Sequence, residues 1–95
     1  MICELIYLEP SLIDYFIANC ALGNGSITVR DKGNRVSISN GRFMLYKDGG
    51  YVFNRVPREQ AQKIIRRMID KHKRFEYDGF YYHSPEMNVW TKQEI

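Results

Sequence analysis

Residues 26–56 read SITVRDKGNRVSISNGRFMLYKDGGYVFNRV and carry the strongest signal for the architecture of the chain. Apolar and polar residues alternate within it, as in Ile27-Thr28-Val29 and Val36-Ser37-Ile38, which is the period of strands with one buried face. The turn sequences Lys32-Gly33-Asn34 and Asn40-Gly41 separate the alternating runs. The stretch therefore predicts an antiparallel β-meander of four or more strands.

The last strand of the meander is expected at the end of this stretch, and a separate strand is expected near the N-terminus. Asp48-Gly49-Gly50 marks another turn, which leads into a strand over residues 51–55. Residues 2–8 carry apolar side chains in a pattern that fits either a short strand or a lead-in to a helix, and we favour the strand. An unpaired edge of such a sheet leaves room for a homodimer.

A helical period precedes and follows the meander. After Pro10, apolar residues recur at helical spacing until Gly23, a residue type that commonly closes a helix. After Pro57, a second apolar stripe continues to His72 on a helix rich in Lys and Arg. Each helix has one apolar face, so we expect both helices to pack on the same face of the sheet.

The C-terminal part predicts a β-hairpin and then a tail. Asp78-Gly79 stands between aromatic residues and is a strong signal for a two-residue turn, with pairing expected to end at Ser84-Pro85. The last ten residues lack a clear period, so residues 84–95 are expected to be a frayed tail unless an aromatic anchor such as Trp90 ties them down. In total, residues 1–95 predict a single small α+β domain.

Aromatic residues are concentrated in the C-terminal fifth of the chain. If they alternate on the hairpin, one set covers the edge of the core and only Tyr81 and His83 point outward. The alternative is an exposed hairpin that anchors a partner protein. The residues expected to cover the core are Phe75, Tyr77, Phe80 and Tyr82.

Charge is sorted along the chain. Residues 26–75 contain thirteen of the fourteen Lys and Arg residues and four acids, a net charge of +9, while each flank has −3. A positive segment attracts phosphates or an acidic protein surface, which indicates binding. The +9 divides into +4 on the meander and +5 on the second helix with Phe75, so two basic surfaces are expected.

The first candidate surface is the sheet face turned away from the helices. Arg neutralises phosphates and stacks on bases, and Tyr offers a stacking surface, so this face suits a single strand of nucleic acid. The same residue types are also ordinary on the solvated side of an antiparallel sheet. The predicted binding residues on this face are Arg30, Arg35, Arg42 and Tyr46.

The second candidate surface is the basic side of the second helix, where five cations fall within about three turns. Such a cluster suits a phosphate backbone or an acidic groove. It is also common on a solvated helix face, where Glu59 with Lys63 and Asp70 with Arg74 are spaced as i,i+4 pairs. Of the two surfaces, we expect the helix to be the one used. Its predicted binding residues are Lys63, Arg66, Arg67, Lys73 and Arg74.

Enzyme motifs are absent from the sequence. The two histidines and two cysteines stand in no metal-ligand spacing, and neither a GxSxG motif nor a phosphate-binding glycine loop occurs. We therefore expect no catalytic activity, no metal site and no cofactor. A small enzyme whose catalytic residues meet only in three dimensions is the residual alternative.

The chain carries no sign of export or membrane insertion. Residues 1–4 lack the features of a secretory signal, and no run approaches the roughly twenty apolar residues of a membrane span. We expect a cytoplasmic protein without membrane contact. Cys3 and Cys20 are then expected to be reduced.

The order helix, antiparallel strands, helix resembles double-stranded-RNA-binding domains in outline. The last three strands with the second helix resemble the small DNA-binding domains of some integrases. Both resemblances are topological only. The family-like basic signature at the start of the final helix is not evident, because residues 58–63 are mixed in charge. Fold analogy alone does not assign a function.

The sequence favours binding over catalysis. We expect a non-catalytic interaction protein, an adaptor or inhibitor that docks on a larger protein or nucleoprotein complex through its basic and aromatic surface. Phage-encoded accessory proteins that inhibit host defence are one class of this size. The alternative is a domain that binds DNA or RNA directly, mainly through contacts to the phosphate backbone.

Overall fold

The computed structural model describes residues 3–47, 50–53 and 56–95, with only the backbone of residues 51–53. The turn predicted at Asp48-Gly49 and the end of the strand predicted over residues 51–55 lie outside this part of the chain. The described residues form eight strands and two helices. In chain order these are β1 (Cys3–Tyr7), α1 (Pro10–Ala21), β2 (Ser26–Asp31), β3 (Asn34–Ser39), β4 (Arg42–Lys47), β5 (Gly50–Phe53), α2 (Arg58–His72), β6 (Arg74–Tyr77), β7 (Phe80–Glu86) and β8 (Val89–Glu94).

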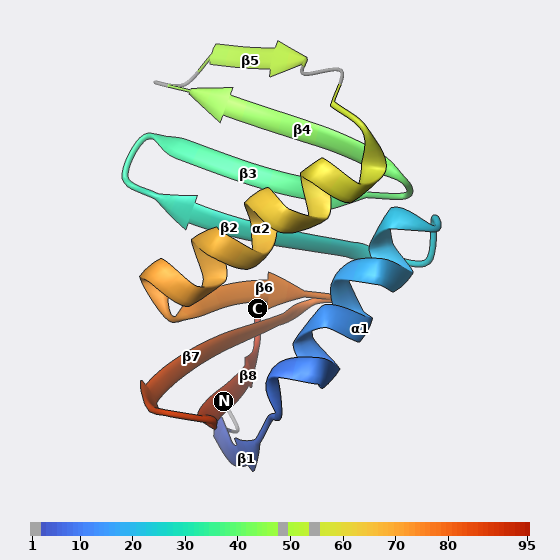
Figure 1. Cartoon of the computed structure of the whole chain (residues 1–95). Coiled ribbons are helices and arrows are strands. Elements are labelled where there is room, and N and C mark those ends of the chain that lie inside the picture. The colour runs from blue at the N-terminus through green and yellow to red at the C-terminus, as the bar shows by residue number, and fades with distance from the viewer. Residues whose placement is uncertain (1–2, 48–49, 54–55) are drawn as a thin grey trace.

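All the strands belong to one antiparallel sheet in the order β1-β8-β7-β6-β2-β3-β4-β5. Both helices cover the same face of this sheet, with α2 crossing β2 and β3 (Figure 1). Strands β2 to β5 form the meander, and β6 with β7 forms the C-terminal hairpin. The predicted α+β fold class is therefore confirmed.

Helix α1 begins and ends where the sequence predicts. Pro10 is its first residue, a position that requires no backbone N–H donor. Gly23 has a φ angle of +101°, which favours glycine over residues with a side chain. The Gly23 N–H donates to the Cys20 carbonyl, and the Asn24 N–H donates to the Asn19 carbonyl. These two bonds form a Schellman closure and satisfy carbonyls at the end of the helix.

Two-residue turns connect β3 to β4 and β6 to β7. Asn40 and Gly41 both have positive φ angles, +50° and +79°, as do Asp78 and Gly79, +47° and +83°. Positive φ at both central residues is the geometry that matches the twist of paired strands. The turn between β7 and β8, which includes Asn88 at +64°, was not predicted from the sequence.

The prediction of a frayed tail over residues 84–95 is wrong. β8 lies between β7 and β1, with Trp90 opposite Ile6, and Trp90 is only 4% exposed. The prediction that pairing ends at Ser84-Pro85 also fails, because β7 passes an irregularity there and pairs again at Glu86. The partner that orders this segment is β1, at the other end of the sequence, so no local period reveals it.

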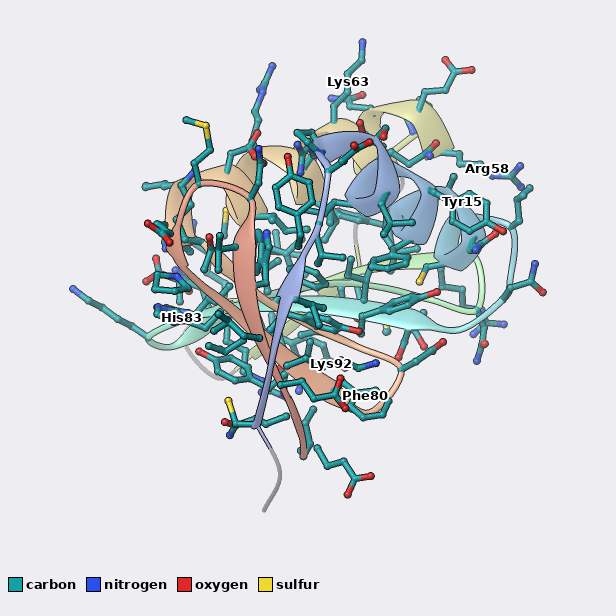
Figure 2. All side chains as sticks on the ribbon, turned by 90° about the horizontal axis from the view of Figure 1, so that it is seen from below. Tyr15, Arg58, Lys63, Phe80, His83 and Lys92 are labelled. Carbon is teal, nitrogen blue, oxygen red and sulfur yellow. The ribbon has the colours of Figure 1, made fainter. Side chains whose placement is uncertain are left out.

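The core lies between the sheet and the helices, as the alternation predicts. Ile27 and Val29 of β2 are fully buried, together with Ile65 and Ile69 of α2. In the C-terminal hairpin, Phe75 and Tyr82 are buried, and Tyr77 and Phe80 pack against the same core. The prediction that these aromatic residues cover the core is therefore confirmed. Figure 2 shows His83 on the other side of β7 from Phe80.

Candidate functional site

Arg66 is held between the two helices. Its Nε atom lies 3.1 Å from Oδ1 of Asp14 in α1, and its Nη1 atom lies 3.5 Å from Oδ1 of Asp70 in α2. Asp70 thus pairs with Arg66, and not with Arg74 as the i,i+4 spacing predicted. Because its side chain is only 23% exposed and faces two acids, Arg66 contributes little positive charge to the surface.

Arg74 is part of the sheet. The pairing between β2 and β6 consists of two residue pairs, Ile27 with Tyr77 and Thr28 with Glu76. Beyond them, the Arg74 guanidinium donates from Nε and Nη2 to the Arg30 carbonyl, at 3.2 and 2.9 Å. The Arg74 side chain therefore continues the connection between these strands where the backbone pairing stops.

Three exposed cations form a row along the outer side of α2, apart from the exposed Arg58 at its first residue. Lys63, Arg67 and Lys71 are four residues apart, so they lie on the same side of the helix, one turn from each other. Within the described part of the chain, none of them forms an ion pair. Figure 2 shows Lys63 pointing away from the sheet. We call these three residues the α2 stripe; Lys71 was missed by the sequence prediction, although its spacing from Lys63 and Arg67 is a usable signal.

Lys73 lies apart from the α2 stripe, after the last turn of the helix. It has a φ angle of +56° and its N–H donates to the Ile69 carbonyl. It lines a cavity of about 420 Å³ between α2 and the turn that joins β7 to β8. Asp70 and Glu86 line the same cavity, so its charge is mixed.

Three of the four residues predicted on the sheet face lie together. Arg30 of β2 is opposite Arg35 of β3, which in turn is opposite Tyr46 of β4. The guanidinium carbon of Arg35 lies 3.8 Å from the centroid of the Tyr46 ring, a cation–π contact. Arg30 forms an ion pair with Glu76 of β6. Arg42 is separate, since it lies at the other end of β4, near the turn at Asn40-Gly41.

A shallow depression of about 280 Å³ adjoins these residues on the sheet face. A second depression of about 260 Å³ shares Arg30 and Lys32 with it and is also lined by Arg74, Glu76 and Tyr81. Lys32 was not predicted as a binding residue because it belongs to a turn and not to an alternating strand. We call the first depression the hairpin hollow. It is lined by Arg30, Lys32, Gly33, Asn34, Arg35 and Tyr46.

Two titratable groups outside these surfaces, Cys20 and His72, are fully or mostly buried within the fold. Cys20 is fully buried, and burial raises the pKa of its thiol to about 12, which keeps it protonated at neutral pH. His72 is mostly buried and its Nε2 atom lies 3.7 Å from Oδ2 of Asp31, a contact between α2 and β2. Among the residues that the structure describes, no three His, Cys, Asp or Glu side chains converge as ligands for a metal ion.

No family model, curated protein or solved structure matches this chain significantly. The candidate sites therefore rest on the residues of the chain itself. Neither α1 nor α2, the helices of the described residues, is long and apolar enough to cross a membrane.

Proposed function

We propose that this chain is a non-catalytic interaction protein, an adaptor or inhibitor that docks on an acidic surface of a larger protein or nucleoprotein complex. The observation that carries the proposal is the α2 stripe, in which Lys63, Arg67 and Lys71 are exposed, aligned and without an ion pair in the described chain. Unneutralised charges of one sign steer and orient an oppositely charged partner. The two free cysteines fit a reducing compartment such as the cytoplasm.

The shape of the stripe indicates the kind of partner surface. A helix that presents a single row of cations is convex, so it fits an acidic groove or the edge of a nucleoprotein better than a small molecule. Two acids lie near the row. Asp70 is occupied by Arg66, and Glu59, one turn before Lys63, forms no ion pair with it among the described residues. Each long Lys or Arg side chain keeps its charged end in water until a partner approaches.

A pair of matched charge reversals tests this proposal. The stripe variant is Lys63→Glu with Arg67→Glu, and the control is Lys32→Glu with Arg35→Glu, which changes the same residue types and the same net charge at the hairpin hollow. Partners are captured from a nuclease-treated extract and quantified by mass spectrometry. The amount of each specific partner is expected to fall at least about tenfold with the stripe variant and to stay unchanged with the control. Capture that the stripe variant leaves unchanged, or that disappears with nuclease, contradicts the proposal.

Direct binding of DNA or RNA at the hairpin hollow is the second candidate function. It is favoured by the arrangement of Arg30, Lys32 and Arg35 around a depression, with the Arg35 guanidinium stacked on Tyr46. Cations that follow a backbone beside an aromatic ring are the usual elements of single-strand binding. For this function, the variant Lys32→Glu with Arg35→Glu is expected to lose nucleic-acid binding, whereas the stripe variant is expected to keep it.

Fluorescence anisotropy with a labelled single-stranded oligonucleotide measures this binding. Each phosphate contact that is lost should reduce the slope of log affinity against log salt by roughly 0.7. Binding that does not weaken as salt rises from about 50 to 200 mM rules out phosphate contacts as its basis.

A further inference from the structure

Strand β1 is a free edge of the sheet. It pairs with β8 on one side, and within the described chain no strand lies on its other side. Edge strands are usually protected by charged side chains, especially Lys, by Pro, by a bulge or by a covering element. β1 reads CELIY and has Glu4 as its single charged residue, with neither Lys nor Pro, while Leu5 and Tyr7 are 72% and 64% exposed.

The hydrogen-bonding direction of β1 identifies the groups on its outer edge. The Leu8 N–H donates to the Asn88 carbonyl at 2.9 Å, so the backbone of Leu8 faces β8. In an antiparallel strand, the backbone groups of successive residues point to alternate sides. The N–H and C=O groups of Cys3, Leu5 and Tyr7 therefore point away from β8.

We propose that two copies of this chain pair through β1 in antiparallel orientation, with Leu5 of one copy opposite Leu5 of the other. This register places Cys3 opposite Tyr7 of the second copy, so every outward-facing residue meets another outward-facing residue and the two exchange both hydrogen bonds. Glu4, the single charged residue of β1, lies opposite Ile6 of the second copy. This two-fold pairing covers the β1 edge of each copy with the β1 edge of the other, so the assembly closes as a dimer.

The first turns of α1 extend the apolar surface at the same edge. Leu12 and Tyr15 are 38% and 60% exposed, and together with Tyr7 they line an open hollow of about 490 Å³. Figure 2, seen from the β1 end of the sheet, shows Tyr15 on the surface of α1. The two-fold axis of an antiparallel strand pair is perpendicular to the sheet, so α1 of both copies lies on the same face. A second copy thus supplies matching backbone groups for the strand and apolar side chains for the helix layer.

Sedimentation equilibrium over a dilution series tests the dimer. The unaltered chain of 11.3 kDa is expected to show twice that mass. Leu5→Lys places two ammonium groups opposite each other at the two-fold axis and is expected to weaken the dimer at least about 30-fold. The control, Leu22→Lys, makes the same change at a 64% exposed residue beyond the other end of α1 and should leave the dimer intact. A monomeric mass for the unaltered chain, or a dimer that Leu5→Lys leaves intact, overturns the proposal.

Oxidative cross-linking tests the register. In a hydrogen-bonded antiparallel pair the Cα atoms are about 5.5 Å apart, a separation that a disulfide can span. The double variant Cys3→Ser/Leu5→Cys is therefore expected to form a covalent dimer on mild oxidation, whereas Cys3→Ser/Leu22→Cys is not. A folded, dimeric Cys3→Ser/Leu5→Cys chain that does not cross-link contradicts the Leu5 register. None of these substitutions touches the α2 stripe, so failure of the dimer leaves the proposed docking function unaffected.

Discussion

The two halves of the sheet are built in different ways. The meander half, β2 to β5, joins strands that follow one another in sequence through short turns. The terminal half, β1 with β6 to β8, brings together the two ends of the chain, since β1 pairs with β8. The meander segment, residues 26–56, has a net charge of +4, whereas residues 76–95 carry −3. The first half depends on local contacts, and the second depends on contacts across nearly the whole sequence.

The seam between β2 and β6 shows how the halves are connected. Only two residue pairs continue the backbone ladder there. Side chains complete the connection, through the bonds from Arg74 to the Arg30 carbonyl and the ion pair between Arg30 and Glu76. Part of the charge that is sorted along the sequence therefore stabilises the fold, and only the remainder is open to a partner.

The largest expected effect comes from removing the aromatic packing on the terminal side of the seam. Phe75 is 1% exposed, stacks on Tyr82 with ring centroids 4.6 Å apart, and meets the edge of Trp90 at 5.1 Å. Phe75→Ala should lower the free energy of unfolding by about 3–5 kcal/mol because it leaves a cavity in the core. Urea denaturation measures this loss. Tyr81→Ala, on the other face of the same hairpin, is the control, and an equal loss in both variants would contradict the assigned faces.

A smaller effect is expected at the polar side of the seam. Arg74→Gln removes a charged donor from the Arg30 carbonyl and should cost about 1–2 kcal/mol. Arg67→Gln makes the same change on the α2 stripe and should stay within about 0.5 kcal/mol of the unaltered chain. Denaturation curves of the two variants decide between structural and surface roles. Equal stabilities would show that Arg74 does not support the seam.

Alkaline pH should lower the stability of the fold through a buried thiol in α1 and two tyrosine hydroxyls of the terminal half. Burial, aided by the negative charge of Asp78, raises the pKa of the Cys20 thiol from 9.0 to about 12, and burial also raises the pKa of the Tyr77 and Tyr82 hydroxyls. Above pH 9 the unfolded chain loses its thiol proton while the folded chain retains it, so stability falls as the pH rises toward 12, by at most about 1.4 kcal/mol per pH unit for this group. Below pH 9 the contribution is complete.

Comparison with Cys20→Ala isolates the contribution of the thiol. Denaturation of both proteins at pH 8 and pH 10 should show a larger loss in the unaltered chain, because the variant lacks the titrating group. An equal loss would mean that the pKa of the thiol is not raised by the fold.

The smallest effect expected is a difference between two glycines with similar backbone angles. Gly23 and Gly25 have φ angles of +101° and +106°, so alanine is strained at both positions. A Cβ atom at Gly25 would collide with the Asp78 carboxylate, whereas nothing lies within 4 Å of one at Gly23. Gly25→Ala should therefore cost about 1 kcal/mol more than Gly23→Ala in thermal denaturation. Adding Asp78→Gly should remove this difference, and its persistence would exclude the collision as the cause.

The sequence alone determined the elements whose signals are local. Alternation in residues 26–47 placed the strands of the meander with the correct buried faces. Asn40-Gly41 placed a turn of the meander, and Asp78-Gly79 placed the turn of the C-terminal hairpin, because strand period and turn preference depend on neighbouring residues. Both helices followed from the apolar spacing after Pro10 and Pro57, and the end of the first followed from Gly23. The inward set of aromatic residues in the C-terminal hairpin was also correct.

The contacts between distant residues became known only from the folded chain. It ordered residues 89–94 against β1, paired Arg66 with Asp14, and tied Arg74 to the carbonyl of Arg30. Of the five cations predicted on the second helix, Lys63 and Arg67 remain on the exposed stripe, and Lys71 joins them. A sequence lists charges without their partners, and whether a cation is neutralised within the fold or presented to another molecule depends on contacts between elements that are far apart in the chain.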